Sequence, residues 1–223
     1  MTLLKSPGDN NWLFSPEFLF GQGPIIPVIV IDDLTKAVPL AKAVMAGGMR
    51  VLEVTLRTPA AMEAIALMRE AVPDAIVGAG TVTNAVELKQ CQAAGAQFVI
   101  SPGLTQELLR AGKKSTIALI PGAASVSELM EGVLLGYTHF KFFPAEASGG
   151  IPFLRSIFGP FPALRFCATG GVKAENFHDY LALPNVGCVG GSWVVPEKLI
   201  KSSDWLGITE LCRQMQGRGL GTC

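Results

Sequence analysis

The sequence predicts an α/β fold, a single (β/α)8 TIM barrel with an extra N-terminal segment. Short apolar runs rich in Val, Ile and Phe recur eight times at nearly equal spacing, as expected for parallel strands that are buried on both faces. Helical patterns separate these runs, so the repeated unit is strand, loop and helix. The chain has 223 residues, enough for one such barrel, and only 16% of them are charged, which fits a sheet covered on both sides.

The N-terminal residues 1–23 precede the first apolar run and contain a helix start. Ser15 is a favourable N-cap, Pro16 fits the first helical position, and Glu17 lies in the first turn. We therefore expect an N-terminal extension that is helical in part, followed by one catalytic barrel domain over residues 24–223.

The strands and helices of the barrel follow in order along the chain. Helical patterns such as residues 34–48 and 84–95 end in the Gly that is expected just past a helix C-terminus. An open doubly wound sheet would have fewer strands and a nucleotide fingerprint, and a leucine-rich solenoid would need an L-x-x-L-x-L pattern that is missing. The strands are expected to begin near Ile25, Arg50, Ala75, Ala96, Ile117, His139, Ala163 and Val186.

The composition excludes several classes of partner. Eighteen basic residues balance eighteen acidic ones, so no net field attracts nucleic acid or an anionic membrane. No apolar run approaches the roughly 18 residues of a membrane span, and the apolar N-terminus is interrupted before a signal-peptide core could form. We therefore expect a soluble protein. A reducing cytoplasm is the expected compartment, because the cysteines are odd in number and lack C-x-x-C spacing: Cys91, Cys167, Cys188, Cys212 and Cys223.

Lys141 is the only lysine in the middle of an expected strand, within H-F-K-F-F-P. Because side chains alternate along a strand, Phe140 and Phe142 point to one face, while Lys141 and Phe143 point into the barrel. Desolvation disfavours a charged ammonium, which is how a lysine becomes a free-amine nucleophile near neutral pH. The alternative is a lysine that is paired structurally with an acid or reaches water at the barrel mouth.

The second strand carries a carboxylate on its inward face. In R-V-L-E-V-T-L-R-T, Glu53 and Arg57 share one face and should point into the barrel or its rim. An inward carboxylate can accept and return a proton, as a general acid and base does. The alternative is an ion pair of Glu53 with Lys141 or Arg57 that only neutralises buried charge.

Glycines mark the ends of three other strands. Gly78 and Gly80 in V-G-A-G-T leave room for a ligand to approach the backbone, and Thr81 offers a hydroxyl at the mouth. C-A-T-G-G and C-V-G-G-S-W each place a diglycine before a segment that could open a helix. Loops after the last two strands of such barrels commonly bind phosphate through backbone amides. The candidate phosphate ligands are Gly170, Gly171, Gly191 and Ser192, and tight turns are the alternative explanation.

The sequence offers no basis for a metal or an organic cofactor. The chain has two histidines, His139 at the start of a strand and His178 on a helix, and both are expected to be structural. The V-G-A-G-T segment lacks the third glycine of a dinucleotide fingerprint. Cys167 is expected to be a small residue of the barrel core.

Several segments between residues 24 and 196 together closely resemble the bacterial 2-dehydro-3-deoxy-6-phosphogluconate (KDPG) aldolase family, also described as 4-hydroxy-2-oxoglutarate aldolase. They are P-V-I-V-I, R-V-L-E-V-T-L-R-T, V-G-A-G-T-V, F-V-I-S-P-G, F-K-F-F-P-A-E, T-G-G-V and G-G-S-W. Ala168, where Pro is expected before T-G-G, and Ser148, where Asn is expected before G-G, depart from the family pattern. Neither position carries chemistry.

The resemblance implies a class I aldolase that needs no cofactor and no metal and assembles as a homotrimer. Lys141 would form the Schiff base, Glu53 would act as acid and base, and the substrate would be a phosphorylated 2-keto-3-deoxy sugar acid that yields pyruvate. Arg57 and Thr81 would bind the carboxylate. The other implied substrate ligands are Pro102, Phe143 and Thr169, and the implied phosphate ligands are Gly170, Gly171, Gly191 and Ser192.

Three other functions stay open at this point. A galactonate-specific aldolase of the same family usually differs around E-V-T-L-R and K-F-F-P-A-E. A sugar-phosphate isomerase or epimerase would use Glu53 as base and Lys141 only as an electrostatic partner. A sensor of phosphorylated ligands would need neither residue for chemistry, and trapping of an imine separates the last two from an aldolase.

Overall fold

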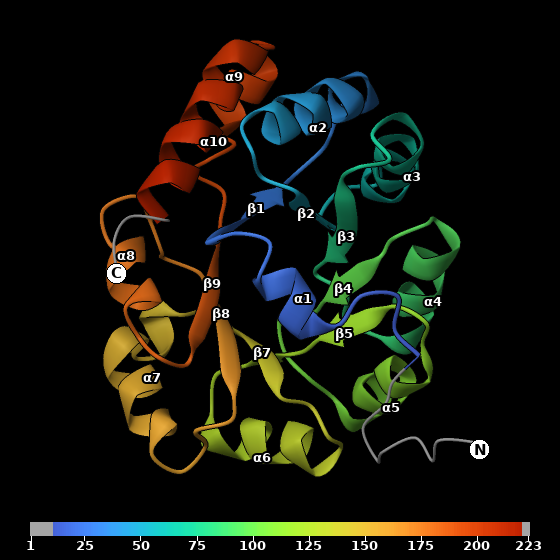
Figure 1. Cartoon of the computed structure of the whole chain (residues 1–223). Coiled ribbons are helices and arrows are strands. Elements are labelled where there is room, and N and C mark those ends of the chain that lie inside the picture. Colours follow the sequence, from blue (N-terminus) through green and yellow to red (C-terminus); the bar gives the residue numbers. More distant parts are fainter. Residues whose placement is uncertain (1–10, 220–223) are drawn as a thin grey trace, which may run out of the picture.

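The computed structural model describes residues 11–219 and confirms the barrel. Parallel strands form a ring that is surrounded by helices (Figure 1). Residues 1–10 of the expected N-terminal extension, and Cys223, lie outside the described residues. The strands are β1 Ile25–Ile29, β2 Val51–Thr55, β3 Ile76–Gly80, β4 Phe98–Ile100, β5 Ala118–Ile120, β6 Gly122–Ala123, β7 His139–Phe142, β8 Arg165–Thr169 and β9 Val186–Gly191.

The helices alternate with the strands and cover the outside of the ring. Asn84, Thr105 and Ser125 cap three of them by accepting hydrogen bonds from backbone amides of the first turn. The α-helices are α1 Pro16–Phe20, α2 Ala37–Ala46, α3 Ala61–Ala71, α4 Ala85–Ala93, α5 Gln106–Lys114, α6 Val126–Leu134, α7 Gly150–Phe158, α8 Phe177–Leu181, α9 Glu197–Lys201 and α10 Trp205–Gly219, and 3-10 turns span Leu34–Lys36 and Glu146–Ser148. Among these described helices, none is long and apolar enough to cross a membrane.

The fifth strand of the expected eight is divided into two by Pro121. The strand order around the ring is β5-β4-β3-β2-β1-β9-β8-β7-β6. The first and last strands of this order, β5 and β6, are consecutive in the chain. β5 pairs with β4 and β6 pairs with β7. Because proline has no N–H to donate, the ladder breaks there, but the Pro121 carbonyl still accepts a bond of 2.9 Å from the Lys141 amide. The eight expected strand starts lie within two residues of the observed ones.

Two apolar clusters pack on the two faces of the ring. The larger lies between strands and helices and includes Leu52 and Val54. The smaller fills the barrel interior and includes Val51, Phe98 and Cys167. The alternation predicted for the second strand is therefore confirmed, and Cys167 is the core residue expected from the sequence.

Helix α1 closes the end of the barrel where the strands begin (Figure 1). It starts where the sequence predicts, with the Ser15 hydroxyl accepting a hydrogen bond from the Phe18 amide. Its Leu19 and Phe20 join the interior cluster, and Phe20 also contacts the ring of His139 at the start of β7. With this end closed, the strand C-termini form the open mouth where a barrel binds its ligands.

Candidate active site at the barrel mouth

Lys141 and Glu53 meet inside the barrel. The Lys141 Nζ donates a hydrogen bond of 2.9 Å to the Glu53 Oε1, and the two residues are 5% and 0% exposed. β7 and β2 carry them inward because each occupies a position that alternates with apolar residues of the outer face. The two residues selected from the sequence are therefore brought together, and one buried charge offsets the other.

The second carboxylate oxygen of this pair has no partner. Glu53 Oε2 is buried and accepts no hydrogen bond among the described residues. A buried carboxylate oxygen without a donor is costly, so the site is suited to receive a hydroxyl or a water there. The arrangement offers an amine and a proton acceptor within one enclosed space.

The glycines of β3 make room for side chains, which corrects the expectation that they make room for a ligand. A methyl group on Gly80 would lie 2.2 Å from Glu53 Oε1, and one on Gly78 would lie 2.5 Å from the ring of Phe98. Gly80 is thus required by the position of the carboxylate. The sequence pattern identified these glycines but not the residues that fill the space.

Four other expected substrate ligands lie at or just after the C-terminal ends of strands, on the side of the mouth. The Lys141 Nζ lies 5.3 Å from the centre of the Phe143 ring, above its face. Thr169 follows on the neighbouring strand β8 and is buried. Thr81, directly after β3, has a φ of 62°, which is strained for a β-branched residue and is typical of functional sites. The backbone of Pro102, after β4, approaches β6 closely because Gly122 has no side chain there.

Arg57 lies in the turn after β2 and is exposed, and it pairs with neither Lys141 nor Glu53 among the described residues. It lines a cleft of about 580 Å³ together with Ser192, Trp193 and Val28. The sequence placed Arg57 and Ser192 at opposite ends of one substrate, and in the structure both residues line this one cleft at the rim of the barrel.

The two diglycine segments lie where expected, after β8 and at the end of β9, but no helix begins directly behind them. Gly170 and Gly171 have φ values of 99° and 82°, whereas Gly191 is excluded from carrying a side chain by the ring of Trp193. Helix α8 begins only at Phe177, and α9 only at Glu197. A turn separates each diglycine from the next helix. An anion bound at the glycines would therefore contact the backbone amides of the turn and not the N-terminus of a helix.

Sequence reasoning missed a polar contact behind the first diglycine. The Tyr180 hydroxyl donates a hydrogen bond to Glu146 Oε1, and the Glu146 amide donates to the Gly170 carbonyl. Glu146 stands in the F-K-F-F-P-A-E segment, which is a signal, but nothing in the sequence links it to Tyr180 on α8. Trp193, with an indole N–H that has no described partner, was also missed.

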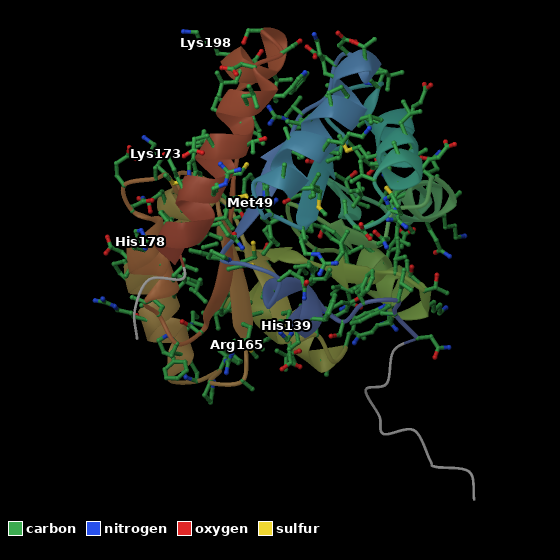
Figure 2. The ribbon with its side chains drawn as sticks, turned by 45° about the horizontal axis from the view of Figure 1, so that its top comes forward. Met49, His139, Arg165, Lys173, His178 and Lys198 are labelled. Atoms are coloured by element: carbon green, nitrogen blue, oxygen red, sulfur yellow. The ribbon has the colours of Figure 1, made fainter. Side chains whose placement is uncertain are left out.

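The two histidines lie apart from this site and from each other. His139 lies near α1 at the closed end of the barrel, close to Arg165, whereas His178 lies on the outer flank near Lys173 (Figure 2). No group of three or more His, Cys, Asp or Glu side chains in the described part of the chain is arranged to hold a metal ion.

Comparison with known proteins gives one consistent result. The family model described as KDPG and KHG aldolase matches residues 18–211. The chain is 59% identical to the 2-dehydro-3-deoxy-phosphogluconate aldolase of Pseudoalteromonas atlantica, over 92% of this chain and 95% of that protein. It is 54% identical to the KHG/KDPG aldolase of Escherichia coli K12, over 92% and 96% of the two chains.

A solved structure is similar over almost the whole chain. The KDPG aldolase of Legionella pneumophila, with pyruvate captured as a covalent carbinolamine intermediate, is 57% identical and superposes with a TM-score of 0.91, over 92% of this chain and 100% of that chain. The aldolase of Zymomonas mobilis with 3-phosphoglycerate is 48% identical, with a TM-score of 0.85 over 89% and 93% of the two chains.

Proposed function

The chain belongs to the KDPG and KHG aldolase family, and we propose that its barrel mouth cleaves KDPG to pyruvate and glyceraldehyde 3-phosphate through an imine on Lys141. The observation that carries the assignment of residues is the buried contact of 2.9 Å between Lys141 and Glu53, with one carboxylate oxygen left unpartnered. The carbinolamine of pyruvate in the Legionella enzyme supports the same covalent chemistry here.

The reaction begins with the amine of Lys141. Transfer of its proton to Glu53 leaves a neutral amine that adds to the ketone carbon and forms a carbinolamine. Glu53 then returns this proton to the hydroxyl of the carbinolamine, which leaves as water, so an iminium forms and Glu53 is again a carboxylate. The iminium acts as the electron sink for the next step.

Glu53 carries the proton transfers. It takes the proton of the hydroxyl on carbon 4, and the electrons of the bond between carbons 3 and 4 move to the iminium nitrogen. Glyceraldehyde 3-phosphate leaves, and a pyruvate enamine stays on Lys141. Glu53 returns a proton to carbon 3 of the enamine, which becomes the methyl group, and hydrolysis frees pyruvate.

The remaining residues bind the two ends of the substrate. Thr81 and Arg57 hold the carboxylate, with the planar fork of the guanidinium suited to two oxygens. Pro102, Phe143 and Thr169 enclose the reacting carbons. The phosphate meets backbone amides and the hydroxyl at the two glycine-rich turns, formed by Gly170, Gly171, Gly191 and Ser192. The unphosphorylated 4-hydroxy-2-oxoglutarate would be cleaved to pyruvate and glyoxylate at the same lysine.

Two wider proposals accompany this function. The protein works as a homotrimer, which is supported by its family resemblance and by an exposed apolar face on α6. It works in the cytoplasm, where a reducing environment fits four buried cysteines that carry free thiols.

Trapping with borohydride tests the assignment of Lys141. Pyruvate with borohydride should inactivate the enzyme and add one reduced pyruvyl group to Lys141, because hydride converts the imine into a stable secondary amine that stays on the lysine. Peptide mass spectrometry locates the label. A label on a surface lysine such as Lys89, or full aldolase activity with no label, would show that the Schiff base is not on Lys141.

A further inference from the structure

The segment after β7 is hydrogen-bonded to the last residue of β8 and to the turn that follows it. The Ala145 amide donates to the Thr169 carbonyl at 2.8 Å, and the Glu146 amide donates to the Gly170 carbonyl at 3.0 Å. These bonds continue the pairing of β7 with β8 beyond the ends of the strands. The first glycine-rich turn is therefore held on its backbone side by residues 145 and 146.

Glu146 also occupies the space over the second glycine of this turn. A methyl group on Gly171 would lie 2.5 Å from Glu146 Cγ and 2.6 Å from Glu146 Cβ. Gly171 has in addition a φ of 82°, which side-chain-bearing residues rarely adopt. The conformation of the turn and the position of the Glu146 side chain therefore depend on each other.

Tyr180 fixes the far end of the Glu146 side chain. Tyr180 is fully buried on α8, and its hydroxyl donates to Glu146 Oε1. Burial and the neighbouring carboxylate raise the pKa of Tyr180 above its ordinary value, so the hydroxyl stays a donor at neutral pH. The bond directs the exposed carboxylate towards α8.

We propose that Glu146 and Tyr180 are positioning residues that hold the Gly170–Gly171 turn in the conformation that binds the phosphate of the substrate. This inference rests on the proposed function, in which the amides of this turn bind phosphate. Neither side chain forms a hydrogen bond with Lys141 or Glu53 among the described residues, so we assign both to the phosphate end alone. A carboxylate released from Tyr180 would also be free to turn towards the phosphate and repel it.

The matched pair Tyr180→Phe and Tyr137→Phe tests the proposal. The chain has only two tyrosines, and each donates from a buried hydroxyl: Tyr137 bonds the Leu109 carbonyl at 2.7 Å, away from the barrel mouth. Tyr180→Phe should lower kcat/KM for KDPG roughly tenfold, mainly through KM, which is the size expected for a lost hydrogen bond to a charged group. Activity on 4-hydroxy-2-oxoglutarate should change less than about twofold. Tyr137→Phe should not separate the two substrates.

The partner residue gives a second and independent variant, because Glu146 is exposed and its replacement should leave the protein folded. Glu146→Ala should reproduce the selective loss of Tyr180→Phe. Glu146→Gln keeps both the acceptor for the hydroxyl and the carbons over Gly171, so it should retain most of the activity on KDPG.

Gly171→Val separates failure of this inference from failure of the phosphate assignment. If Gly171→Val loses KDPG activity selectively but Tyr180→Phe and Glu146→Ala do not, the turn binds phosphate without their help and the inference is wrong. If none of these variants distinguishes the two substrates in folded protein, the turn is not a phosphate site, and both statements fall. Equal losses of kcat/KM on both substrates in the Tyr180 and Glu146 variants would show that the contact between Tyr180 and Glu146 only stabilises the fold.

Discussion

A lysine and a glutamate inside a barrel are costly to bury, and the neighbouring residues show how this chain accommodates them. Each charge offsets the other at 2.9 Å, and removal of one partner from such a pair typically costs about 3–5 kcal/mol. The space for the carboxylate exists because Gly80 has no side chain. The reactive pair therefore depends on three strands: β7 carries Lys141, β2 carries Glu53, and β3 provides the space at Gly80.

Glu53→Gln keeps the shape of the side chain but removes its ability to accept a proton. We expect turnover of KDPG to fall by roughly 10²-fold or more, while borohydride still traps pyruvate on Lys141 at least in part. Steady-state kinetics and mass spectrometry of the trapped protein measure the two effects. Near-normal turnover, with exchange of the methyl protons of pyruvate intact, would mean that the base lies elsewhere.

Gly80→Ala should impair catalysis without altering any residue that reacts. The added methyl would lie 2.2 Å from Glu53 Oε1 and 2.7 Å from its Cγ, so the carboxylate must move away from Lys141. Because misplacement by about 1 Å can cost 10²-fold in rate, we expect turnover to fall at least tenfold with a native circular dichroism spectrum.

The control for this substitution is Gly159→Ala, where the methyl would come no closer than 3.9 Å to another residue. It should leave turnover unchanged. A Gly80→Ala variant as active as Gly159→Ala would show that the exact position of Glu53 does not matter.

At the scale of elements, most of the barrel could be predicted from the sequence because its signals are local. Apolar runs, caps and the Ser15–Pro16–Glu17 helix start depend on neighbours in the chain, and the structure places the corresponding elements as expected. Lys141 and Glu53 were identifiable because a charged side chain is rare on the inward face of a buried strand. The division of the fifth strand at Pro121 could have been predicted from its missing N–H.

The rest of the site depends on packing between distant segments. Gly78 and Gly80 accommodate Phe98 and Glu53, and no local pattern states which side chain fills a glycine space. The contact of Tyr180 with Glu146 joins α8 to the segment after β7 across 34 positions. The turns between the diglycines and the next helices could not be predicted either, because the number of residues between a strand end and the following helix start is not fixed.

Acidification should weaken the closed end of the barrel through His139. This half-buried ring packs edge-on against Phe20 of α1, with centres 5.2 Å apart, and it faces Glu17 and Arg165. Burial, together with Arg165 and against the effect of Glu17, lowers the pKa of His139 below its ordinary value of 6.5. The folded state therefore binds fewer protons than the unfolded state, and stability falls as pH drops below about 6.5.

We expect Tm to fall between about pH 7 and pH 5 in the wild type, and to fall less in His139→Gln. Differential scanning calorimetry across this range measures the slopes. His178→Gln serves as the matched control, because this second and last histidine is exposed on α8 and its removal should leave the slope as in the wild type. Equal slopes in wild type and His139→Gln would show that protonation of His139 does not destabilise the fold.

At the scale of the whole molecule, the two ends of the barrel have different tasks. The end where the strands begin is closed by α1 and serves stability, while the mouth carries the ion pair, the strained Thr81 and the glycine-rich turns. The strained Thr81 and the buried charges of Lys141 and Glu53 thus lie at the end of the barrel where the reaction takes place. The outer surface also carries an apolar stripe on α6.

The stripe consists of Val126, Met130, Val133 and Leu134, which are 43%, 57%, 39% and 79% exposed and recur at the spacing of one helix face. A contiguous apolar face of this kind is typical of protein contacts, and the proposed homotrimer offers the partner. Light scattering should therefore give the wild type a mass about three times that of the 23.5 kDa chain. Met130→Asp places a charge in the stripe and should shift the mass towards one chain, with the circular dichroism spectrum unchanged.

The control for Met130→Asp is Leu206→Asp on α10, where an apolar side chain is 84% exposed outside the stripe, so the same charge on this surface should leave the mass of the assembly unaltered. A wild type with the mass of one chain would refute the homotrimer itself. A trimer that persists in Met130→Asp would place its interface on another surface. Dissociation in both variants would mean that added charge, and not its position on α6, weakens the assembly, so only the difference between the two variants assigns α6 to the interface.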